Sequence, residues 1–360
     1  MNKLFISDCH ISSGLGLNSK PYPWEWLTQK DHDRLLAFLI WLATRTQIQS
    51  KLPIIDEIIY LGDMFDGWVF PHDQKPPTFE EFLRSDYAAP LIAAMKNLSE
   101  KIPSVYQLGN HDLGMTSPIL NSILPKVLFS TAPFVWDNIR AEHSNLYDLF
   151  NAPDPLRQDS LPMGYFLSRV AATMNRKNGT LSPGIEEEIK EIAQVIEDKE
   201  TLPQGVFDAI CDKASIGQNE IVIMPDDIWN GKNTTINEIR TMYQNLISEW
   251  RNREGVISAD LAIAAACNDY SLIADELFLE GKATTVIFGH THISKFIHHW
   301  FPFFRNRRYL NTGCFCTAIP KVTWVEMTEK KARLYSCAGF DTNRQPQNLS
   351  YDSFGSWSLW

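Results

Sequence analysis

Carboxylate, amide and imidazole side chains recur along this chain in short clusters, each of which directly follows an apolar run. The clusters are Asp8-Cys9-His10, Gly62-Asp63-Met64-Phe65-Asp66, Gly109-Asn110-His111-Asp112, His143, and Gly289-His290-Thr291-His292. In the first and last clusters one residue separates the two potential ligands, so on an extended chain both side chains point to the same face. Each of these pairs can therefore chelate one ion. A glycine opens three of the clusters, where it lets the chain turn sharply.

The donor types indicate which metals and which reaction the clusters suit. Carboxylates, imidazoles and an amide oxygen, without a thiolate, favour Mn²⁺, Fe²⁺/³⁺ or Zn²⁺ in a reactive site over a cysteine-rich structural zinc site. Seven of the ten such groups in these clusters would already be more than one ion needs. Two ions about 3.5 to 4 Å apart, bridged by one carboxylate and by a hydroxide, clamp a phosphoryl group for in-line displacement. The predicted reaction is therefore hydrolysis of a phosphoester.

The elements that must bring these clusters together follow from the apolar patterns. Over residues 1–145, short apolar strands alternate with helices: strands at 3–7, 54–61 and 104–108, and helices at about 31–46 and 79–100. This alternation predicts a largely parallel sheet. The carboxyl ends of parallel strands lie along one edge, where ligands bind, so clusters up to 280 residues apart are expected to form one site.

The pattern changes twice further along the chain. Residues 146–281 show apolar positions at three- and four-residue spacing, as in Ile185 to Ile196 and Ile236 to Trp250, which predicts a helical insertion or cap. Short strands separated by turns return after it. We therefore expect a discontinuous core of residues 1–145 and 282–340, and a tail at 341–360 to which the pattern assigns no structure.

Length and charge narrow the class of protein. The 360 residues exceed the roughly 250 to 300 at which a single core stops growing, which agrees with a core that carries an insertion. Lys and Arg number 33 against 43 Asp and Glu, and the net charge of −10 disfavours bulk nucleic acid as a partner. No run without a charged residue exceeds thirteen residues, and the first charges come too early for a signal peptide. A soluble cytoplasmic protein is expected, with its six cysteines as thiols.

The clusters, in this order, resemble the signature of the calcineurin-like metallophosphoesterase superfamily. The matching pieces are Asp8-x-His10, Gly62-Asp63-x-x-Asp66, Gly109-Asn110-His111-Asp112, a later His and Gly289-His290-x-His292. The resemblance covers residues 1 to about 145 and 283 to 337 and leaves the helical middle outside it. It implies an α/β fold, the metallophosphoesterase α/β/β/α sandwich, with residues 146–281 as a predominantly helical insertion.

The resemblance also implies roles for individual residues. Three residues would hold one metal, three would hold the other and one carboxylate would bridge them: Asp8, His10 and His292; Asn110, His143 and His290; and Asp63. His111 would be the general acid at the leaving group, Asp112 would orient the His111 ring, and Asp66 would support the ligands from behind. The two ions would be divalent, with Mn²⁺ first and Fe or Zn as alternatives.

Residues beside the motifs indicate a branch of the superfamily. Gly67 and Trp68 follow Asp66 where Ser/Thr protein phosphatases have an arginine, which argues against that activity. Gly-Asp-x-Phe-Asp-x-Trp, and the segment from Glu142 to Asp148, are more similar to the bacterial branch that includes UDP-diacylglucosamine hydrolases. That subgroup commonly has Arg at the position of His111. The expected substrate is a small, nucleotide-linked or lipid-linked phosphoester.

Two other functions stay open, namely a non-catalytic interaction module on the same fold and a nuclease, which needs a basic groove. Cys314 and Cys316 are expected to pack a strand face in the core. Segment 300–308 combines four aromatic residues with three arginines. A packed hairpin with a solvated tip is favoured there, with contact to a lipid surface or a diphosphate as the alternative.

Overall fold

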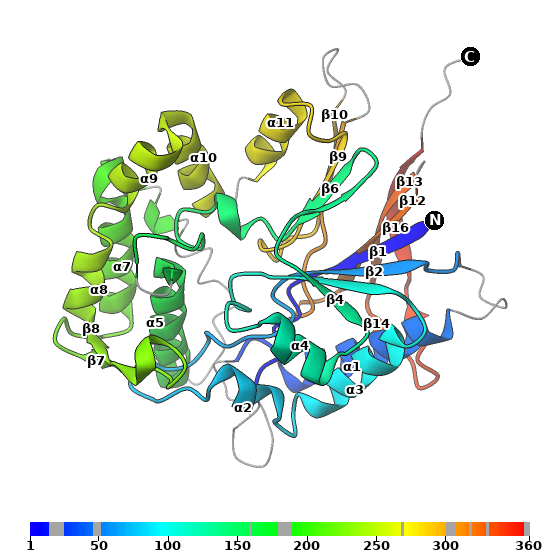
Figure 1. Ribbon diagram of the computed structural model, residues 1–360, viewed down its shortest axis with the longest axis horizontal. Helices are drawn as coiled ribbons and strands as arrows, with labels where there is room; N and C mark the ends of the chain where they lie inside the picture. Colours follow the sequence, from blue (N-terminus) through cyan, green and yellow to red (C-terminus); the bar gives the residue numbers. More distant parts are fainter. Residues whose placement is uncertain are drawn as a thin grey trace.

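The structure is a computed structural model (Figure 1). It describes residues 1–13, 25–45, 52–157, 160–178, 189, 191–193, 195–196, 198–267, 270–299, 307–316, 319–328 and 331–355. Two β-sheets and the helices that cover them dominate the described residues.

The first sheet has seven strands in the order β16-β13-β12-β1-β2-β3-β4. Strands β1 to β4 run parallel to one another, while β12, β13 and β16 extend the sheet in antiparallel pairs. The bounds are β1 Asn2–Ile6, β2 Glu57–Leu61, β3 Ser104–Gln107, β4 Val127–Ser130, β12 Val322–Thr328, β13 Lys331–Cys337 and β16 Ser350–Gly355. The parallel half is the one that the βαβ pattern predicts.

The second sheet has five strands in the order β10-β11-β9-β6-β5. Strand β9 lies in its centre and runs parallel to both neighbours, β6 and β11. The bounds are β5 Phe134–Trp136, β6 Ile139–Glu142, β9 Thr285–Phe288, β10 Lys295–His299 and β11 Arg307–Asn311. Residues 300–306, which carry most of the aromatic and arginine-rich segment, lie outside the described residues.

Apolar side chains alternate along the strands and so fill both faces of each sheet. Phe5 and Leu61 of the first sheet and Ile287 of the second belong to one buried cluster between the sheets. Leu4, next to Phe5, points the other way into a cluster with helices α1 (Gln29–Thr44) and α3 (Ala89–Ser99). Helix α11 (Ser271–Leu279) packs with Phe288 on the outer face of the second sheet. The layers therefore run helix, sheet, sheet, helix, and the predicted α/β/β/α sandwich is confirmed.

The helices on the outer face of the first sheet differ in one respect from the sequence prediction. Helix α1 is Gln29–Thr44, and the hydroxyl of Thr28 caps its N-terminus. The single helix predicted over 79–100 is wrong, because the chain forms α2 (Phe79–Leu83) and α3 (Ala89–Ser99) with a turn between them. Pro90 lies in the first turn of α3, where its missing N–H costs nothing, whereas in a continuous helix it would remove a hydrogen bond. Helix α4 is Ser117–Ile123.

The described residues between β6 and β9 are mainly helical. The longer helices are α5 Met163–Asn178, α7 Leu202–Lys213, α8 Ile236–Met242, α9 Leu246–Glu254, α10 Val256–Ala266 and α11. The short elements are η1 Asn145–Tyr147, η3 Lys199–Thr201, η4 Trp229–Gly231, and the strand pair β7 Ile221–Val222 and β8 Thr234–Thr235. Figure 1 shows α5, α7, α8 and α9 grouped away from the sheets, whereas α11 covers the second sheet. The division into a core and a cap at 146–281 stays a prediction, and Ile185 of the predicted helix lies outside the described residues.

The tail after Phe340 has structure that the apolar pattern did not assign. Strand β15 (Pro346–Gln347) pairs with β14 (Gly339–Phe340), and β16 pairs with β13 at the edge of the first sheet. Among the described residues, no helix combines the length and the apolar character needed to cross a membrane.

Candidate metal centre

All the predicted motif residues lie at the carboxyl ends of strands. Asp8 and His10 follow β1, Asp63 and Asp66 follow β2, and Asn110 to Asp112 follow β3 in the first sheet. His143 follows β6, and His290 and His292 follow β9 in the second sheet. Backbone hydrogen bonds join the loops: the amides of Asp8 and His10 donate to the carbonyls of Gly62 and Asp63, at 3.2 and 2.9 Å. The backbone N–H of His290 donates to Asp8 Oδ2 at 2.9 Å, so the strand ends of both sheets form one site.

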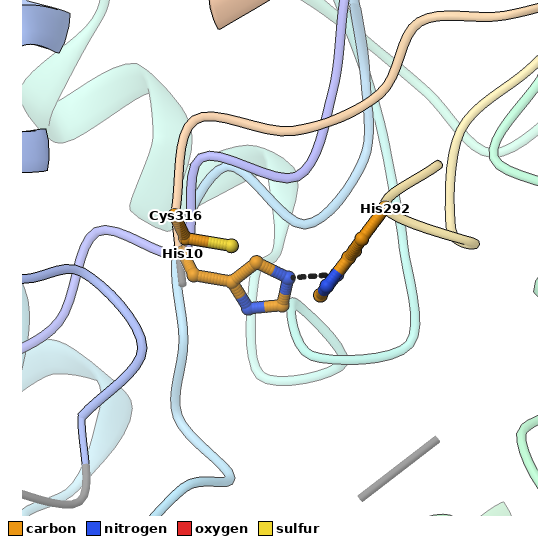
Figure 2. A group of neighbouring side chains, drawn as sticks. All are labelled: His10, His292 and Cys316. Atoms are coloured by element: carbon orange, nitrogen blue, oxygen red, sulfur yellow. Dashed lines mark hydrogen bonds between the residues drawn. The ribbon is translucent and has the colours of Figure 1, made fainter. Parts of the chain in front are cut away.

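One group of donor atoms centres on His10. Its Nδ1 lies 3.0 Å from Asp66 Oδ2, so a proton shared there leaves the lone pair of His10 on Nε2. That Nε2 lies 2.9 Å from His292 Nε2, and Figure 2 shows the two rings meeting at these nitrogens. Asp8 Oδ1 lies 3.4 Å from His292 Nε2 and 4.0 Å from His10 Nε2. Ring nitrogens and a carboxylate that face one another need a proton or a cation between them, so the donors fit a metal ion.

A second group centres on His143. Its Nδ1 lies 2.7 Å from the carbonyl oxygen of Leu61 and donates to it, which again leaves the lone pair on Nε2. This Nε2 lies 3.1 Å from Asn110 Oδ1 and 3.1 Å from Asp63 Oδ2, and both of these oxygens are acceptors. A ring nitrogen of His290 lies within 4.8 Å of donor atoms of Asp63 and His143. The second group also suits a cation.

The Asp63 carboxylate lies between the two groups. Its Oδ2 is 3.1 Å from His143 Nε2 and 3.9 Å from His10 Nε2. Its Oδ1 accepts the backbone N–H of His111 at 2.8 Å, which fixes the carboxylate plane. This side chain, 1% exposed, is thus shared by both groups.

The backbone is strained where the ligand side chains leave it. Asp8, His10, Asp63, His290 and His292 have φ angles of 53°, 46°, 50°, 70° and 57°. Left-handed conformations in residues other than glycine cost on the order of 1–3 kcal/mol each and concentrate at functional sites. Five of the seven predicted ligands carry this strain, which indicates that the loops are shaped for binding rather than for stability.

Two glycines allow the loops to approach one another. A Cβ on Gly62, which has φ +79°, would lie 2.5 Å from the nitrogen of Gly109. A Cβ on Gly109 would lie 2.1 Å from Asp63 Oδ1. A side chain at either position would therefore push the Asp63 loop and the Asn110 loop apart.

Charges in this buried site polarise one another. Burial raises the pKa of the Asp63 carboxyl, but the charges of His143 and His111 outweigh burial and hold this pKa well below its usual value. Burial lowers the pKa of His143, but the Asp63 carboxylate outweighs it and raises this pKa to about 9. The structure thus favours an ionised carboxylate beside a cation, a place that a divalent metal can take over from a proton.

His111 and Asp112 differ from their predicted relation. His111 Nδ1 lies 3.0 Å from Asp66 Oδ1, whereas Asp112 accepts the N–H groups of Phe65 and Gly109 at 2.9 and 3.3 Å. The prediction that Asp112 orients His111 is therefore wrong, because the Asp112 carboxylate turns inward and joins two loops. Asp66 orients the His111 ring and also contacts His10, so its predicted place behind the ligands agrees with its contacts.

Two tryptophans enclose His111. Trp68 stacks on the His111 ring at 4.5 Å between centroids with a 30° tilt, and the Trp26 ring lies 5.0 Å away on a tilted plane. Trp26 also contacts the rings of His10 and His292 at 4.6 and 5.2 Å. No spacing or residue type in the sequence pointed to Trp26, because it lies outside the motifs.

Cys316 is a further neighbour of the site. Cys314 and Cys316 are both fully buried, as expected for core residues. The sulfur of Cys316 also lies within 4.8 Å of ring nitrogens of His10 and His292, beside which Figure 2 shows it. The alternation of residues around Cys314 and Cys316 predicts only that both side chains are buried. It could not predict that Cys316 lies beside His10 and His292.

A small cavity of about 50 Å³ opens onto the site. Its lining includes Trp26 and motif residues such as His111 and His292. The other lining residues come from the segment between β6 and β9: Phe150, Asn151, Gly164, Leu167, Ser168 and Ile189. The helical segment therefore shapes access to the motif residues.

The layer order, the motif order and the grouping of the motifs at one edge define a metallophosphoesterase fold. The sequence model of the calcineurin-like phosphoesterase family matches residues 1–294, and the chain belongs to that family. A comparison with curated proteins gives no match.

Several solved structures resemble the chain along its whole length. A dimetal phosphatase from Danio rerio is 13% identical, with 99% of this chain and 98% of that chain covered and a TM-score of 0.39. Vacuolar Protein Sorting 29 from Cryptosporidium parvum is 11% identical, with 99% and 98% covered and a TM-score of 0.33. GAP50 from Plasmodium is 9% identical, with 99% and 88% covered and a TM-score of 0.37.

Proposed function

We propose that the chain is a dinuclear-metal phosphoesterase that hydrolyses a phosphomonoester, a phosphodiester or a diphosphate. The observation that carries this proposal is the position of Asp63 Oδ2 between two groups of nitrogen and oxygen donors, at 3.9 Å from His10 and 3.1 Å from His143. One ion would be held by Asp8, His10 and His292, the other by Asn110, His143 and His290, with Asp63 shared between them.

The donor set supports divalent ions such as Mn²⁺, Fe²⁺ or Zn²⁺. When bound, two such ions would supply Lewis acidity at the phosphoryl group and lower the pKa of an attacking water. Neighbouring residues orient the proposed ligands: Asp66 fixes the ring tautomer of His10, and the Leu61 carbonyl fixes that of His143. These side chains are buried, which excludes bulk water from the proposed ligands.

His111 is the proposed general acid. Hydrogen bonding of Nδ1 to Asp66 leaves Nε2 as the nitrogen that can face a substrate, and His111 lines the cavity. Trp26 and Trp68 hold the ring plane in place. A proton delivered from Nε2 would neutralise the oxygen of the departing group as the P–O bond breaks.

The substrate is proposed to be small, nucleotide-linked or lipid-linked. Trp68 belongs to the sequence Gly-Asp-x-Phe-Asp-x-Trp, which resembles the UDP-diacylglucosamine hydrolase branch, and it stacks on His111, which lies where that branch commonly has an arginine. A diphosphate is therefore among the candidate substrates, and the proposal does not extend to the lipid-linked substrate of that branch.

The test is hydrolysis of p-nitrophenyl phosphate, its bis ester and a panel of nucleotide and sugar diphosphates by protein loaded with Mn²⁺, Fe²⁺ or Zn²⁺. We expect turnover that requires metal and disappears in Asp63→Asn. Asp226→Asn, at an exposed carboxylate paired with Lys75, is the matched control and should keep full activity. Equal rates in Asp63→Asn and the native protein would contradict the proposal.

The same preparation separates the two alternatives. A non-catalytic module predicts neither turnover nor metal above background. A nuclease predicts cleavage of DNA or RNA with binding that weakens steeply as salt rises.

A further inference from the structure

The loop from Asp148 to Asn151 contacts two residues of the proposed centre, although the sequence assigned no role in the site to either of its polar residues. It follows His143 by a few residues and leads into the helical segment. Its two polar side chains contact Asn110 and His290, and both of these belong to the same proposed metal site.

Asn151 sets the orientation of the Asn110 amide. Asn110 Nδ2 donates to Asn151 Oδ1 at 3.2 Å, and Asn110 Oδ1 consequently faces His143 Nε2 at 3.1 Å. An amide turned by 180° would present its NH₂ group, which cannot bind a cation. The contact with Asn151 therefore favours the amide orientation that binds metal.

Asp148 sets the tautomer of His290. Asp148 Oδ2 lies 3.3 Å from His290 Nε2, nearer than the Asn151 Nδ2 at 3.5 Å, and a proton shared with this carboxylate leaves the lone pair of His290 on Nδ1. The hydroxyl of Tyr270 donates to the same oxygen at 2.9 Å, while the N–H groups of Phe150 and Asn151 donate to Asp148 Oδ1 at 2.7 and 3.2 Å. The carboxylate, 5% exposed, is thus held from several sides before it contacts His290.

The helical segment holds this loop in place. The N–H of Gly164 in α5 donates to the carbonyl of Phe150 at 2.7 Å, and the N–H of Leu149 donates to the carbonyl of Ala262 in α10 at 3.3 Å. Tyr270 immediately precedes α11. A Cβ on Gly164 would lie 2.1 Å from Asn151 Oδ1, so α5 packs directly on the side chain that orients Asn110.

We propose that Asp148 and Asn151 are positioning residues for one of the two metals, the one assigned to Asn110, His143 and His290. This inference rests on the proposed dinuclear centre. The occupancy of that metal site depends on the packing of the helical segment, whereas the site formed by Asp8, His10 and His292 does not. Changes in the helices would therefore remove one metal and leave the other.

The experiment titrates Mn²⁺ into metal-free protein and follows heat and electron paramagnetic resonance, which distinguishes a coupled pair of ions from a single one. We expect two binding events in the native protein. In Asp148→Asn and Asn151→Ala we expect one event unchanged and the other weakened about 10- to 100-fold, the usual cost of losing a residue that orients a ligand. The spectrum should change from that of a coupled pair to that of an isolated ion.

Two milder substitutions test the same proposal in case Asp148→Asn or Asn151→Ala prevents folding. Tyr270→Phe removes one hydroxyl that supports Asp148, and Tyr243→Phe is its matched control, because that equally buried hydroxyl donates to the Leu161 carbonyl instead. Gly164→Ala crowds Asn151, and Gly205→Ala is its control, since a Cβ there meets only Ile196. Only Tyr270→Phe and Gly164→Ala should weaken the second metal.

The outcomes are distinct. A native protein that binds no Mn²⁺ would reject the dinuclear centre itself. Two binding events in the native protein that stay unchanged in Asp148→Asn and Asn151→Ala, or that weaken together, would overturn the positioning role alone. A second metal weakened equally by both members of a matched pair would overturn it as well.

Discussion

At Asp66 one carboxylate joins two functions of the proposed site. Its Oδ2 contacts Nδ1 of the proposed ligand His10, and its Oδ1 contacts Nδ1 of the proposed acid His111, both at 3.0 Å. The same Oδ1 accepts the N–H groups of Trp68 and Val69 at 2.9 and 3.1 Å. The side chain is therefore rigid, and the ring positions of ligand and acid are linked through it.

Replacing His111 should slow poor leaving groups more than good ones. In His111→Ala we expect a loss of about 10²- to 10⁴-fold with an alkyl phosphate, because the departing alkoxide needs a proton. With p-nitrophenyl phosphate the loss should be far smaller, since that phenolate leaves without one. The measurement is kcat/KM across leaving groups of graded pKa, and an equal loss across the series would reject His111 as the acid.

Asp66 and Asp112 should respond differently to the same substitution. Asp66→Asn is expected to lower kcat roughly 10- to 100-fold, because the amide keeps only one acceptor oxygen, so one of the two rings loses the acceptor that fixes its tautomer. Asp112→Asn is expected to lower the free energy of unfolding by about 1–3 kcal/mol, because the amide keeps only one acceptor oxygen and one of the two buried N–H groups is left without an acceptor, while kcat changes less. Kinetics and urea denaturation on both variants check this, and the reverse pattern would restore the original assignment of Asp112.

Residue types and their order were enough to identify the motif residues, but not their partners. Asp66 and Asp112 are both acidic residues next to the same loops, and only the turn geometry decides which one reaches His111. Asp148 and Asn151 also contact the site, yet the sequence assigned neither residue a role: Asp148 entered only through the resemblance of residues 142–148, and Asn151 lies in a segment predicted to be helical. Side-chain direction in turns is set by tertiary packing, which a single sequence does not encode in any periodic signal.

At the scale of elements, the strands were predictable because their apolar runs are short and end at polar clusters. The helices were less so, as the break at Pro90 shows. The sequence pattern predicted helices in the segment that contains α5, but it did not predict that α5 would line the cavity at the site. Arg169 of α5 is fully buried and donates to the carbonyls of Phe70, Gln74 and Ile223 at 2.7, 2.9 and 2.8 Å.

Arg169→Met should destabilise the protein without direct damage to the site. We expect the free energy of unfolding to fall by about 3 kcal/mol, because several buried carbonyls lose their donor at once. Arg240→Met is the control, since Arg240 forms a partly exposed pair with Asp208 worth at most about 1 kcal/mol. Urea denaturation of both variants measures the difference, and equal effects would show that the buried contacts of Arg169 contribute little.

At the scale of the whole molecule, the proposed centre lies at the seam between the two sheets. Asp8, Asp63 and Asn110 follow strands of the first sheet, whereas His143 and His290 follow strands of the second. Bound ions would therefore connect the two sheets at this end. Without them, carboxylates and ring nitrogens from the two sheets face one another there.

Removal of metal should therefore lower thermal stability. Each ion at a concentration 100 times its Kd adds about 2.7 kcal/mol to the native state. Chelation is expected to lower Tm in the native protein and to have a reduced effect in Asp63→Asn, which lacks the shared carboxylate. Scanning calorimetry with and without chelator checks this, and a Tm that does not respond to metal would contradict a centre between the sheets.

Strand β1 also carries a consequence for synthesis on the ribosome. It lies in the interior of the first sheet, yet its antiparallel neighbour β12 comes from more than 300 residues later in the chain. At a translation rate of about 5–20 residues per second, β12 is synthesised on the order of 15 to 65 s after β1. His290 and His292 emerge almost as late, so a nascent chain holds five of the seven proposed metal ligands long before the proposed centre can be completed.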